Sequence, residues 1–215
     1  MNNYGIFFKK YLLEIVQFNL KYILMVGILL MSCEDILSDN SEESGIINPA
    51  DWVELHNPTN ESIAIGLWEF KDGNDTHVFI IPENQVLESG AYLVLCKDSL
   101  AFNDNFPNVS NFIGEFDFGL NGGGELVRLF DTEGLLVDEV NYDDSSPWPL
   151  EPDGNGPTLE LIHPSLDNDL GVNWATSGNN GGTPGVVNSV YTAESSNSLV
   201  SGIVINEINY NSADE

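Results

Sequence analysis

The sequence predicts an all-β fold, either a sandwich or a barrel, for the part of the chain that follows residue 50. Short apolar runs recur there, and turn-forming Gly, Pro, Asn and Asp separate them at intervals of roughly 8–12 residues. Several runs alternate apolar and polar residues, and none sustains the 3.6-residue period of an amphipathic helix. Hydrophobic residues make up 42% of the 215-residue chain, which is enough for a core.

The expected strands follow one another along this region. In the first of them, Val53 and Leu55 share one face while Glu54 and His56 share the other, because side chains alternate along a strand. Cys96 ends the fourth strand, where a buried free thiol acts as a small hydrophobe. A single helical turn is expected near residues 99–103. The apolar runs predict strands at 52–56, 62–70, 76–81, 91–96, 125–130, 135–142 and 158–162.

The connections between these strands have turn chemistry. Asp72-Gly73 suits a tight hairpin, and Asn121–Gly124 is expected to form a flexible, glycine-rich tip. Four prolines between residues 146 and 157 rule out a regular strand ladder there. We therefore expect a long ordered loop over the core, pinned down by Trp148 and Trp174.

The N-terminal residues 1–32 are expected to be an export signal. The apolar run Tyr22–Met31 follows Lys21 and is too short to span a bilayer, which takes about 20 residues, but it suits a signal peptide. Leu30-Met-Ser-Cys33 resembles the bacterial lipobox, which implies cleavage before Cys33 and lipid on its thiol. A plain signal peptide or a short anchor that contains a cysteine stays open.

Residues 33–49 are acidic and rich in Ser and Asn, so we expect a flexible tether there. Acidic residues directly after Cys33 also resemble the surface-export signals of Bacteroidetes lipoproteins. That resemblance places the chain at the outer membrane or cell surface, anchored through the lipid on Cys33.

The charge of the chain excludes several functions. Its formal net charge is −28, and the 183 residues from Cys33 onward carry three basic and 33 acidic residues, a net charge of −30. A phosphate-binding surface needs clustered Lys or Arg, so nucleic-acid binding is excluded. Attraction of the chain to an anionic membrane by charge is excluded in the same way. The acidic excess favours a soluble, monomeric domain.

A set of short phrases in a fixed order resembles the lamin tail domain family. The resemblance covers residues 51–188 and implies an immunoglobulin-like β-sandwich, which we assign to residues 50–188. No rod of heptad repeats accompanies it, and the DNA contact proposed for nuclear relatives cannot carry over to so acidic a domain. The main phrases are Asp51-Trp-Val-Glu-Leu-His-Asn-Pro58, Gly66-Leu-Trp68, Gly90-Ala-Tyr-Leu-Val-Leu95, Asn121-Gly-Gly-Gly-Glu-Leu-Val-Arg-Leu129, Pro147-Trp-Pro149, Leu159-Glu-Leu161 and Gly181-Gly-Thr-Pro-Gly185.

The last strand of the sequence is out of order relative to that family. After a Ser/Asn-rich linker at 189–201, the segment at 202–215 contains Ile203–Tyr210, which resembles the first strand of the family. That strand normally precedes the Asp-Trp-Val-Glu motif. Either it begins a second copy whose remainder is cut off after Glu215, or it folds back into the first-strand slot of 50–188. For this chain we expect the fold-back pairing.

The sequence does not predict an enzyme. The motifs His-Glu-x-x-His, Gly-x-Ser-x-Gly and Gly-x-x-x-x-Gly-Lys are absent. Carboxylate pairs drawn from Glu54, Glu160 and Asp138 have no specificity in so acidic a chain, and we expect Glu54 and Glu160 to face solvent or to accept loop amides. The histidines are far apart in the sequence, at His56, His77 and His163.

Calcium is the one cofactor for which the sequence offers candidates. Oxygen-rich clusters in loops suit a hard cation, although Asp and Asn in loops more often serve turns. The candidate ligands are Asp72, Asn74 and Asp75 in one cluster and Asp167, Asn168 and Asp169 in another, with Asp143 and Asp144 as a further pair.

These observations together predict a non-catalytic surface lipoprotein module that binds a protein or a glycan or takes part in assembly. Trp148 and the tip at Asn121 are the candidate contact residues. The alternative is an N-terminal accessory domain of a larger surface enzyme, such as a spore-coat-kinase-like protein or a hydrolase, that continues beyond Glu215.

Overall fold

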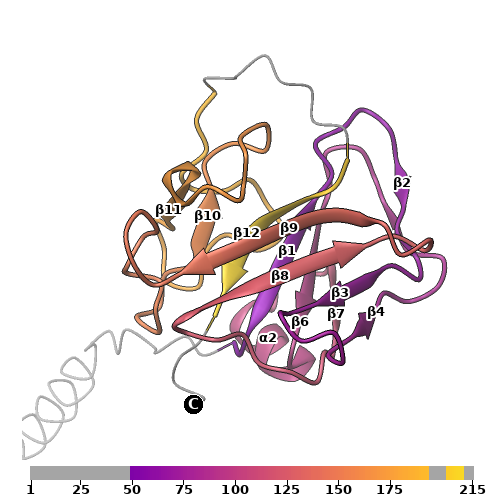
Figure 1. Ribbon diagram of the computed structural model, residues 1–215, viewed down its shortest axis with the longest axis horizontal. Coiled ribbons are helices and arrows are strands. Elements are labelled where there is room, and N and C mark those ends of the chain that lie inside the picture. Colours follow the sequence, from indigo (N-terminus) through magenta and orange to yellow (C-terminus); the bar gives the residue numbers. More distant parts are fainter. Residues whose placement is uncertain (1–48, 194–201, 211–215) are drawn as a thin grey trace, which may run out of the picture. The chain divides into compact units, whose positions relative to one another are not determined.

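The computed structural model describes residues 49–193 and 202–210 (Figure 1). Within these ranges the chain is mostly β-strand, with one α-helix, α2 (Ser99–Asn105), and one 3₁₀ turn, η1 (Gly171–Asn173). The all-β prediction is therefore confirmed. None of the helices in the described ranges is long and apolar enough to cross a membrane. The predictions for residues 1–48, including Cys33, and for 194–201 and 211–215 lie outside the described residues.

The larger sheet brings together strands from both ends of the described chain. All of its neighbouring strands are antiparallel except the last two, which are parallel. Its six strands stand in the order β11 (Trp174–Thr176), β10 (Leu159–Leu161), β12 (Val204–Asn209), β1 (Trp52–His56), β6 (Tyr92–Cys96) and β7 (Phe112–Gly114).

A second sheet packs across the first, and Figure 1 shows its long hairpin crossing over β12 and β1. The main core fills the space between the two sheets, with Val53 and Leu55 on one side and Val127, Leu129 and Val140 on the other. A separate two-stranded sheet pairs β2 (Ile63–Ala64) with β5 (Val86–Leu87). The second sheet has four strands, β4 (Phe79–Ile80), β3 (Glu69–Lys71), β8 (Gly124–Phe130) and β9 (Leu136–Asp143).

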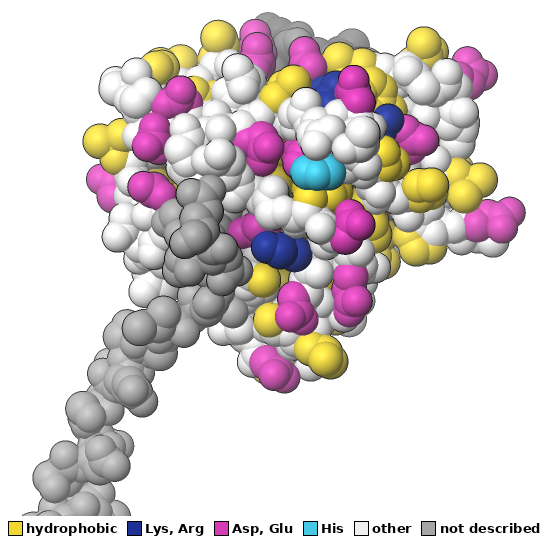
Figure 2. Space-filling model, turned by 60° about the horizontal axis from the view of Figure 1, so that its bottom comes forward, with side chains coloured by type: hydrophobic (Ala, Val, Ile, Leu, Met, Phe, Trp, Pro, Cys, Tyr) yellow, Lys and Arg dark blue, Asp and Glu magenta, His cyan; other side chains and the backbone are white. Residues whose placement is uncertain are grey.

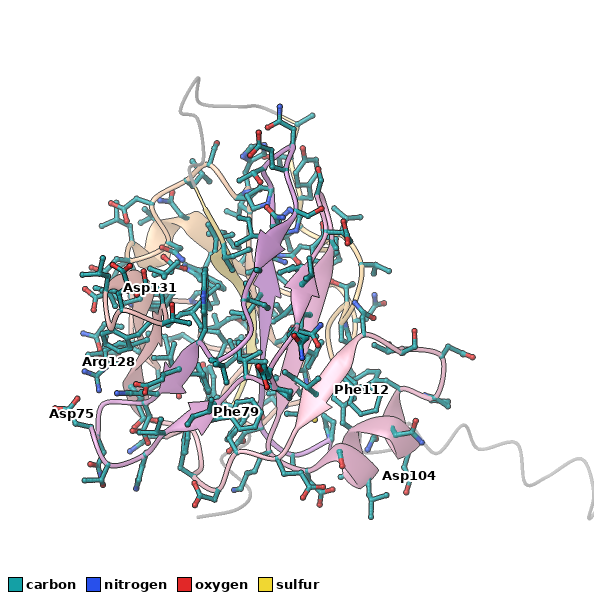
Figure 3. The ribbon with its side chains drawn as sticks, turned by 90° about the vertical axis from the view of Figure 1, so that its right-hand side faces the viewer. Asp75, Phe79, Asp104, Phe112, Arg128 and Asp131 are labelled. Carbon is teal, nitrogen blue, oxygen red and sulfur yellow. The ribbon has the colours of Figure 1, made fainter. Side chains whose placement is uncertain are left out.

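The outer face of the six-stranded sheet is covered as well, which the alternation in β1 does not reveal. Trp52 packs on Phe102 of α2 with ring centroids 6.0 Å apart, and the Asp98 carboxylate caps that helix by accepting from the amides of Leu100 and Ala101. In Figure 3, Asp104 of α2 and Arg128 of the other sheet lie on opposite sides of the six-stranded sheet. The helix therefore shields one end of the outer face.

The strand β12 lies in the slot between β1 and β10, which is the fold-back arrangement. Its register runs antiparallel to β1 and shifts between Glu54 and Leu55, so Asn206 is an extra residue opposite β1. The bulge turns Asn206 and Glu207 together to the outer face, while Ile205 and Ile208 enter the core. The bulge therefore lets the apolar residues on both sides of Asn206-Glu207 pack in the core.

Two of the expected strands differ from the observed ones. The expected strand at 62–70 splits into β2 and β3 around Gly66 and Leu67, where Leu67 has a φ of 68°. A Cβ on Gly66 would lie 2.7 Å from the backbone nitrogen of Asn84, so the chain passes another segment too closely there for a regular strand. The expected strand at 76–81 shortens to β4, because residues 74–77 form a turn.

Candidate functional site

Three buried glutamates lie side by side on the outer face of the six-stranded sheet. Glu54 of β1 stands opposite Glu207 of β12, and Glu207 stands opposite Glu160 of β10. All three have 0% of their surface exposed. Directly opposed residues of antiparallel strands have Cβ atoms about 4.5–5.5 Å apart. These residues are called the glutamate cluster below.

One loop segment, residues 181–190, covers the cluster and donates a backbone amide to each carboxylate. The amide of Gly185 donates to Glu54 Oε2 at 2.6 Å, and that of Val190 donates to Glu160 Oε2 at 3.1 Å. The amide of Thr183 donates to Glu207 Oε1 at 3.0 Å. We call residues 181–190 the covering segment. Its backbone is held down by the carboxylates, so loop and cluster depend on each other.

Side-chain donors supply further hydrogen bonds to the carboxyl groups of the cluster. The Thr158 hydroxyl donates to Glu207 Oε1 at 2.5 Å, and Asn206 Nδ2 donates to Glu54 Oε1 at 2.9 Å. The Thr183 hydroxyl lies 2.8 Å from Glu160 Oε1 and 3.4 Å from Glu207 Oε2, and its single proton can serve only one of them. Glu207 Oε2 is thus the least well satisfied oxygen of the group.

Gly182 is sterically required by this arrangement. A Cβ at that position would lie 1.8 Å from Glu207 Oε1 and 2.4 Å from the hydroxyl oxygen of Thr158. Its φ of +74° is also in the left-handed region that favours glycine. The covering segment can therefore approach the cluster only without a side chain there.

The environment of the cluster favours protonated carboxyl groups. Burial raises the pKa of Glu54 to about 8. Burial, followed by the charges of Glu54 and Glu160, raises the pKa of Glu207 well above its usual range. In the described residues none of the ion pairs involves these glutamates. We conclude that the cluster holds at least one proton at neutral pH.

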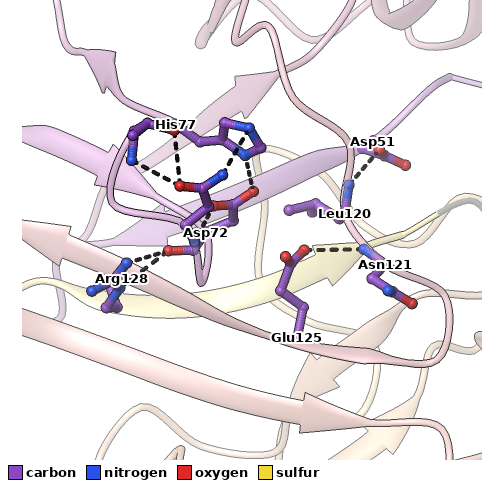
Figure 4. Close-up of polar contacts among 9 residues, drawn as sticks. Asp51, Asp72, His77, Leu120, Asn121, Glu125 and Arg128 are labelled. Carbon is purple, nitrogen blue, oxygen red and sulfur yellow. Dashed lines mark hydrogen bonds and ion pairs between the residues drawn. The ribbon is translucent and has the colours of Figure 1, made fainter.

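A second polar site surrounds Asp72, which is only 2% exposed (Figure 4). Its Oδ2 lies 2.6 Å from Nδ1 of His77, and that hydrogen bond raises the pKa of the imidazole. The His77 ring also stacks on Phe118, with centroids 5.4 Å apart. Arg128 donates to the backbone oxygen of Asp72 through Nε, at 3.1 Å, and Nη2. The loop is therefore fixed by its own polar groups together with Arg128 of β8 and the ring of Phe118.

The first group of calcium candidates belongs to this loop, and its oxygens serve the turn. Asp72 Oδ1 accepts from the amide of Asn74, and Asn74 Oδ1 accepts from the amide and hydroxyl of Thr76. Asp75 pairs with Arg128 at 3.0 Å. Within residues 49–193 and 202–210 no group of three or more His, Cys, Asp or Glu is arranged to hold a metal ion. Calcium binding by this loop stays a prediction.

The second group of calcium candidates also makes hydrogen bonds within the fold. Asp167 accepts from the amide of Asp169, and Asp169 accepts from the amide of Asn141. Asn168 instead turns its Nδ2 toward Asp138, where it donates to Oδ2 at 2.8 Å. Asn168 therefore acts as a donor to the partly buried carboxylate of Asp138. Desolvation of that carboxylate raises the pKa of Asp138 to about 6, although the hydrogen bond from Asn168 opposes the shift.

The two predicted contact residues take structural positions. Trp148 is 8% exposed and packs on Trp174, with ring centroids 6.0 Å apart, so its role is the anchoring one and its ring offers little surface to a ligand. The tip at Asn121 is a hydrogen-bonded turn, in which Asn121 Oδ1 accepts from Gly123 and its backbone oxygen accepts from the Tyr142 hydroxyl. These hydrogen bonds give the tip a defined turn, and its flexibility stays a prediction.

The histidines are not brought together. His56 stacks on Tyr92 with centroids 4.2 Å apart, and burial lowers its pKa. His163 stacks on Tyr191, and His77 belongs to the Asp72 loop.

Glu54 and Glu160 accept hydrogen bonds from loop amides, which is one of the two expectations stated for them. The sequence reasoning missed Glu207 as their neighbour. Its signal was a glutamate set between the core residues Ile205 and Ile208 in a strand that could fold back.

The comparison with known families agrees with this fold. The family model of the lamin tail domain matches residues 34–144, more than half of the chain, from ahead of β1 to the end of β9. No curated protein matches the chain. The strands β10, β11 and β12, which complete the six-stranded sheet, lie beyond the matched residues. Together the match and the two-sheet architecture show an immunoglobulin-like β-sandwich, and the chain belongs to the lamin tail domain family.

Proposed function

We propose that this chain is a bacterial surface lipoprotein whose lamin tail domain is a non-catalytic module that binds a protein or a glycan. The domain would be held at the outer membrane or cell surface by lipid on Cys33, through the acidic tether of residues 33–49. The lipobox-like Leu30-Met-Ser-Cys33 supports the anchor. The chain is strongly acidic, and Asp and Glu side chains are scattered over the face shown in Figure 2, which suits a soluble displayed domain.

The observation that carries the binding role is a group of exposed aliphatic side chains on two loops that meet at Trp148. A Cβ on Gly171 would lie 2.9 Å from the Trp148 ring, so the backbone of one loop rests on the anchor of the other. Around this contact, Leu150 is 57% exposed, Leu170 50% and Val172 66%. Exposed apolar side chains that gather in a patch mark interaction sites more often than single ones do, and we infer that these three gather around the contact between Gly171 and Trp148. We call these three residues the loop patch.

A binding screen tests this function. The purified chain is screened against arrays of glycans and extracellular matrix proteins, alongside a variant with Leu150→Ser, Leu170→Ser and Val172→Ser. We expect the wild-type chain to bind at least one ligand class and the triple variant to lose most of that binding, tenfold or more. A matched control replaces the exposed Leu135 and Leu136 of the β8–β9 hairpin by Ser. Equal loss in both variants, or no binding by the wild-type chain, would contradict the proposal.

A further inference from the structure

The strand β12 is held in the sheet in the way that a protein holds an inserted peptide. It lies between β1 and β10, and its sheet partners are far away in the sequence (Figure 1). Every residue from Ile205 to Asn209 is buried. Residues 194–201 join it to the rest of the described chain. Its position therefore depends on non-covalent contacts made by the slot.

The slot recognises the sequence of the strand and not only its backbone. Ile205 and Ile208 are 0% exposed in the core, and the amide of Ile205 donates to Asp138 Oδ2 at 2.6 Å. Asn206 Nδ2 donates to Asn188 Oδ1 at 2.7 Å as well as to Glu54. The Glu207 carboxyl group is received by donors of Thr158 and of the covering segment. The slot thus makes a specific contact with each of the four residues of the Ile-Asn-Glu-Ile segment.

We propose that this slot also accepts β12 from a second copy of the same chain, so that copies become linked by exchanged strands. Each copy carries both the donor strand and the acceptor slot, and an exchanged strand makes the same contacts as the strand of the same chain. The contact energies are therefore the same for an exchanged strand and for the chain's own strand, and they do not decide which of the two occupies the slot. What remains is the effective concentration of the chain's own strand, which for a short linker is in the millimolar range.

Exchange is consequently expected when copies fold together at high local concentration. A chain whose slot is still empty has the backbone edges of β1 and β10 unpaired, and such edges are templates for an incoming strand. This inference goes beyond the proposed function, because it holds whether or not the chain carries a lipid or binds a protein or glycan.

The first test uses two full-chain variants with complementary defects and different affinity tags. Gly182→Val blocks the slot, because even the Cβ would lie 1.8 Å from Glu207 Oε1, and it leaves β12 intact. Ile208→Asp places a charge in the core and disables the strand, but it leaves the slot intact. After refolding as a mixture, we expect the two chains to copurify through both tags in a 1:1 complex. A mixture of two differently tagged Ile208→Asp chains is the control, and copurification no greater than in that control would overturn the proposal.

A second test keeps both partners able to fold. One full chain carries His56→Cys, the other carries Val204→Cys, and both carry Cys33→Ser. Residues 56 and 204 are opposed in the β1–β12 ladder, within the reach of a disulfide. Refolding the two together under oxidising conditions should give a crosslinked heterodimer. The double variant in a single chain, which crosslinks internally, is the positive control. Monomers alone in the mixture, with that control positive, would refute strand exchange and leave the ligand-binding proposal untouched.

Discussion

The three buried glutamates of the cluster have no basic partner among the described residues, unlike the buried Asp51 and Asp72. Glu54, Glu160 and Glu207 are opposed in one sheet, where three charges without a counter-ion would repel each other at low effective dielectric. Loop amides, hydroxyl groups and at least one bound proton stabilise them instead. The cost of burying acids is therefore lowered by protonation, which ties the stability of the fold to pH.

The sign of that dependence follows from the direction of the pKa shifts. The pKa of Glu54 in the folded chain is raised from its ordinary value of 4.5 to about 8. The folded state then binds a proton that the unfolded state has released, so the stabilisation is complete below about pH 4.5 and is lost as pH rises through about 8. Each such group contributes a slope of roughly 1 kcal/mol per pH unit within that window.

The variant Glu207→Gln tests this account at the level of one residue. The amide oxygen of the new side chain can accept the hydrogen bonds that Oε1 accepts from the Thr158 hydroxyl and the Thr183 amide. Its NH₂ group takes the place of Oε2, whose one hydrogen bond is the 3.4 Å contact with the Thr183 hydroxyl. We expect urea unfolding of the wild-type chain to show stability falling from pH 5 to 8 and the variant to show a shallower fall. Glu61→Gln, at an exposed position, is the control and should leave the slope unchanged. Parallel curves for all three proteins would rule out a proton shared in the cluster.

At the scale of elements, the sequence predicted strands best where the residues alternated cleanly or formed a continuous apolar run. The alternating Val53 and Leu55 and the apolar run up to Cys96 gave β1 and β6 within a residue of their observed bounds. The hydrophobic pattern of Ile203–Tyr210, together with its resemblance to a first strand, was enough to expect fold-back pairing, and the structure has that pairing. The hydrophobic pattern of these strands predicts their place in the fold because one face of each strand belongs to the core.

Other elements could not be predicted from local pattern. Phe112–Gly114 and Trp174–Thr176 are three-residue strands, and they exist only because β6 and β10 offer them a partner. Glu54 and Glu160 were expected either to face solvent or to accept hydrogen bonds from loop amides, and the structure has the second arrangement. The covering segment lies more than 100 residues away in the sequence, and Glu54 meets Gly185 only through the tertiary fold. The calcium candidates belong with these elements, because the sequence could not show that their oxygens also accept hydrogen bonds from turn amides.

At the scale of the whole molecule, the account joins a family domain with an expected lipid anchor. A test of the anchor is metabolic labelling with radioactive palmitate. We expect Cys33→Ser to abolish the label and to move the chain from the membrane to the soluble fraction, since acylation at Cys33 is the expected membrane attachment. Cys96→Ser is the matched control, because Cys96 is buried and should leave the label unchanged. Label retained by Cys33→Ser would contradict lipidation at that thiol.

The family match ends at residue 144, whereas the sandwich in the structure is completed by β10, β11 and β12. The fold-back strand is therefore the part of the whole-molecule account on which most depends. It closes the gap between β1 and β10, supplies Ile203, Ile205, Ile208 and Tyr210 to the core and brings Glu207 to the glutamate cluster. Without it, the cluster would lose Glu207, and the amide of Thr183 and the hydroxyl of Thr158 would lose their acceptor.

Amide hydrogen exchange of the full chain, followed by mass spectrometry, tests that central claim most directly. Peptides from β12 (Val204–Asn209) are compared with peptides from β1 (Trp52–His56) in the same experiment. If β12 fills the slot, both sets of amides should be protected to a similar degree and should open together as denaturant is added. Exchange of the β12 amides at the rate of an unstructured peptide, while β1 stays protected, would contradict the account.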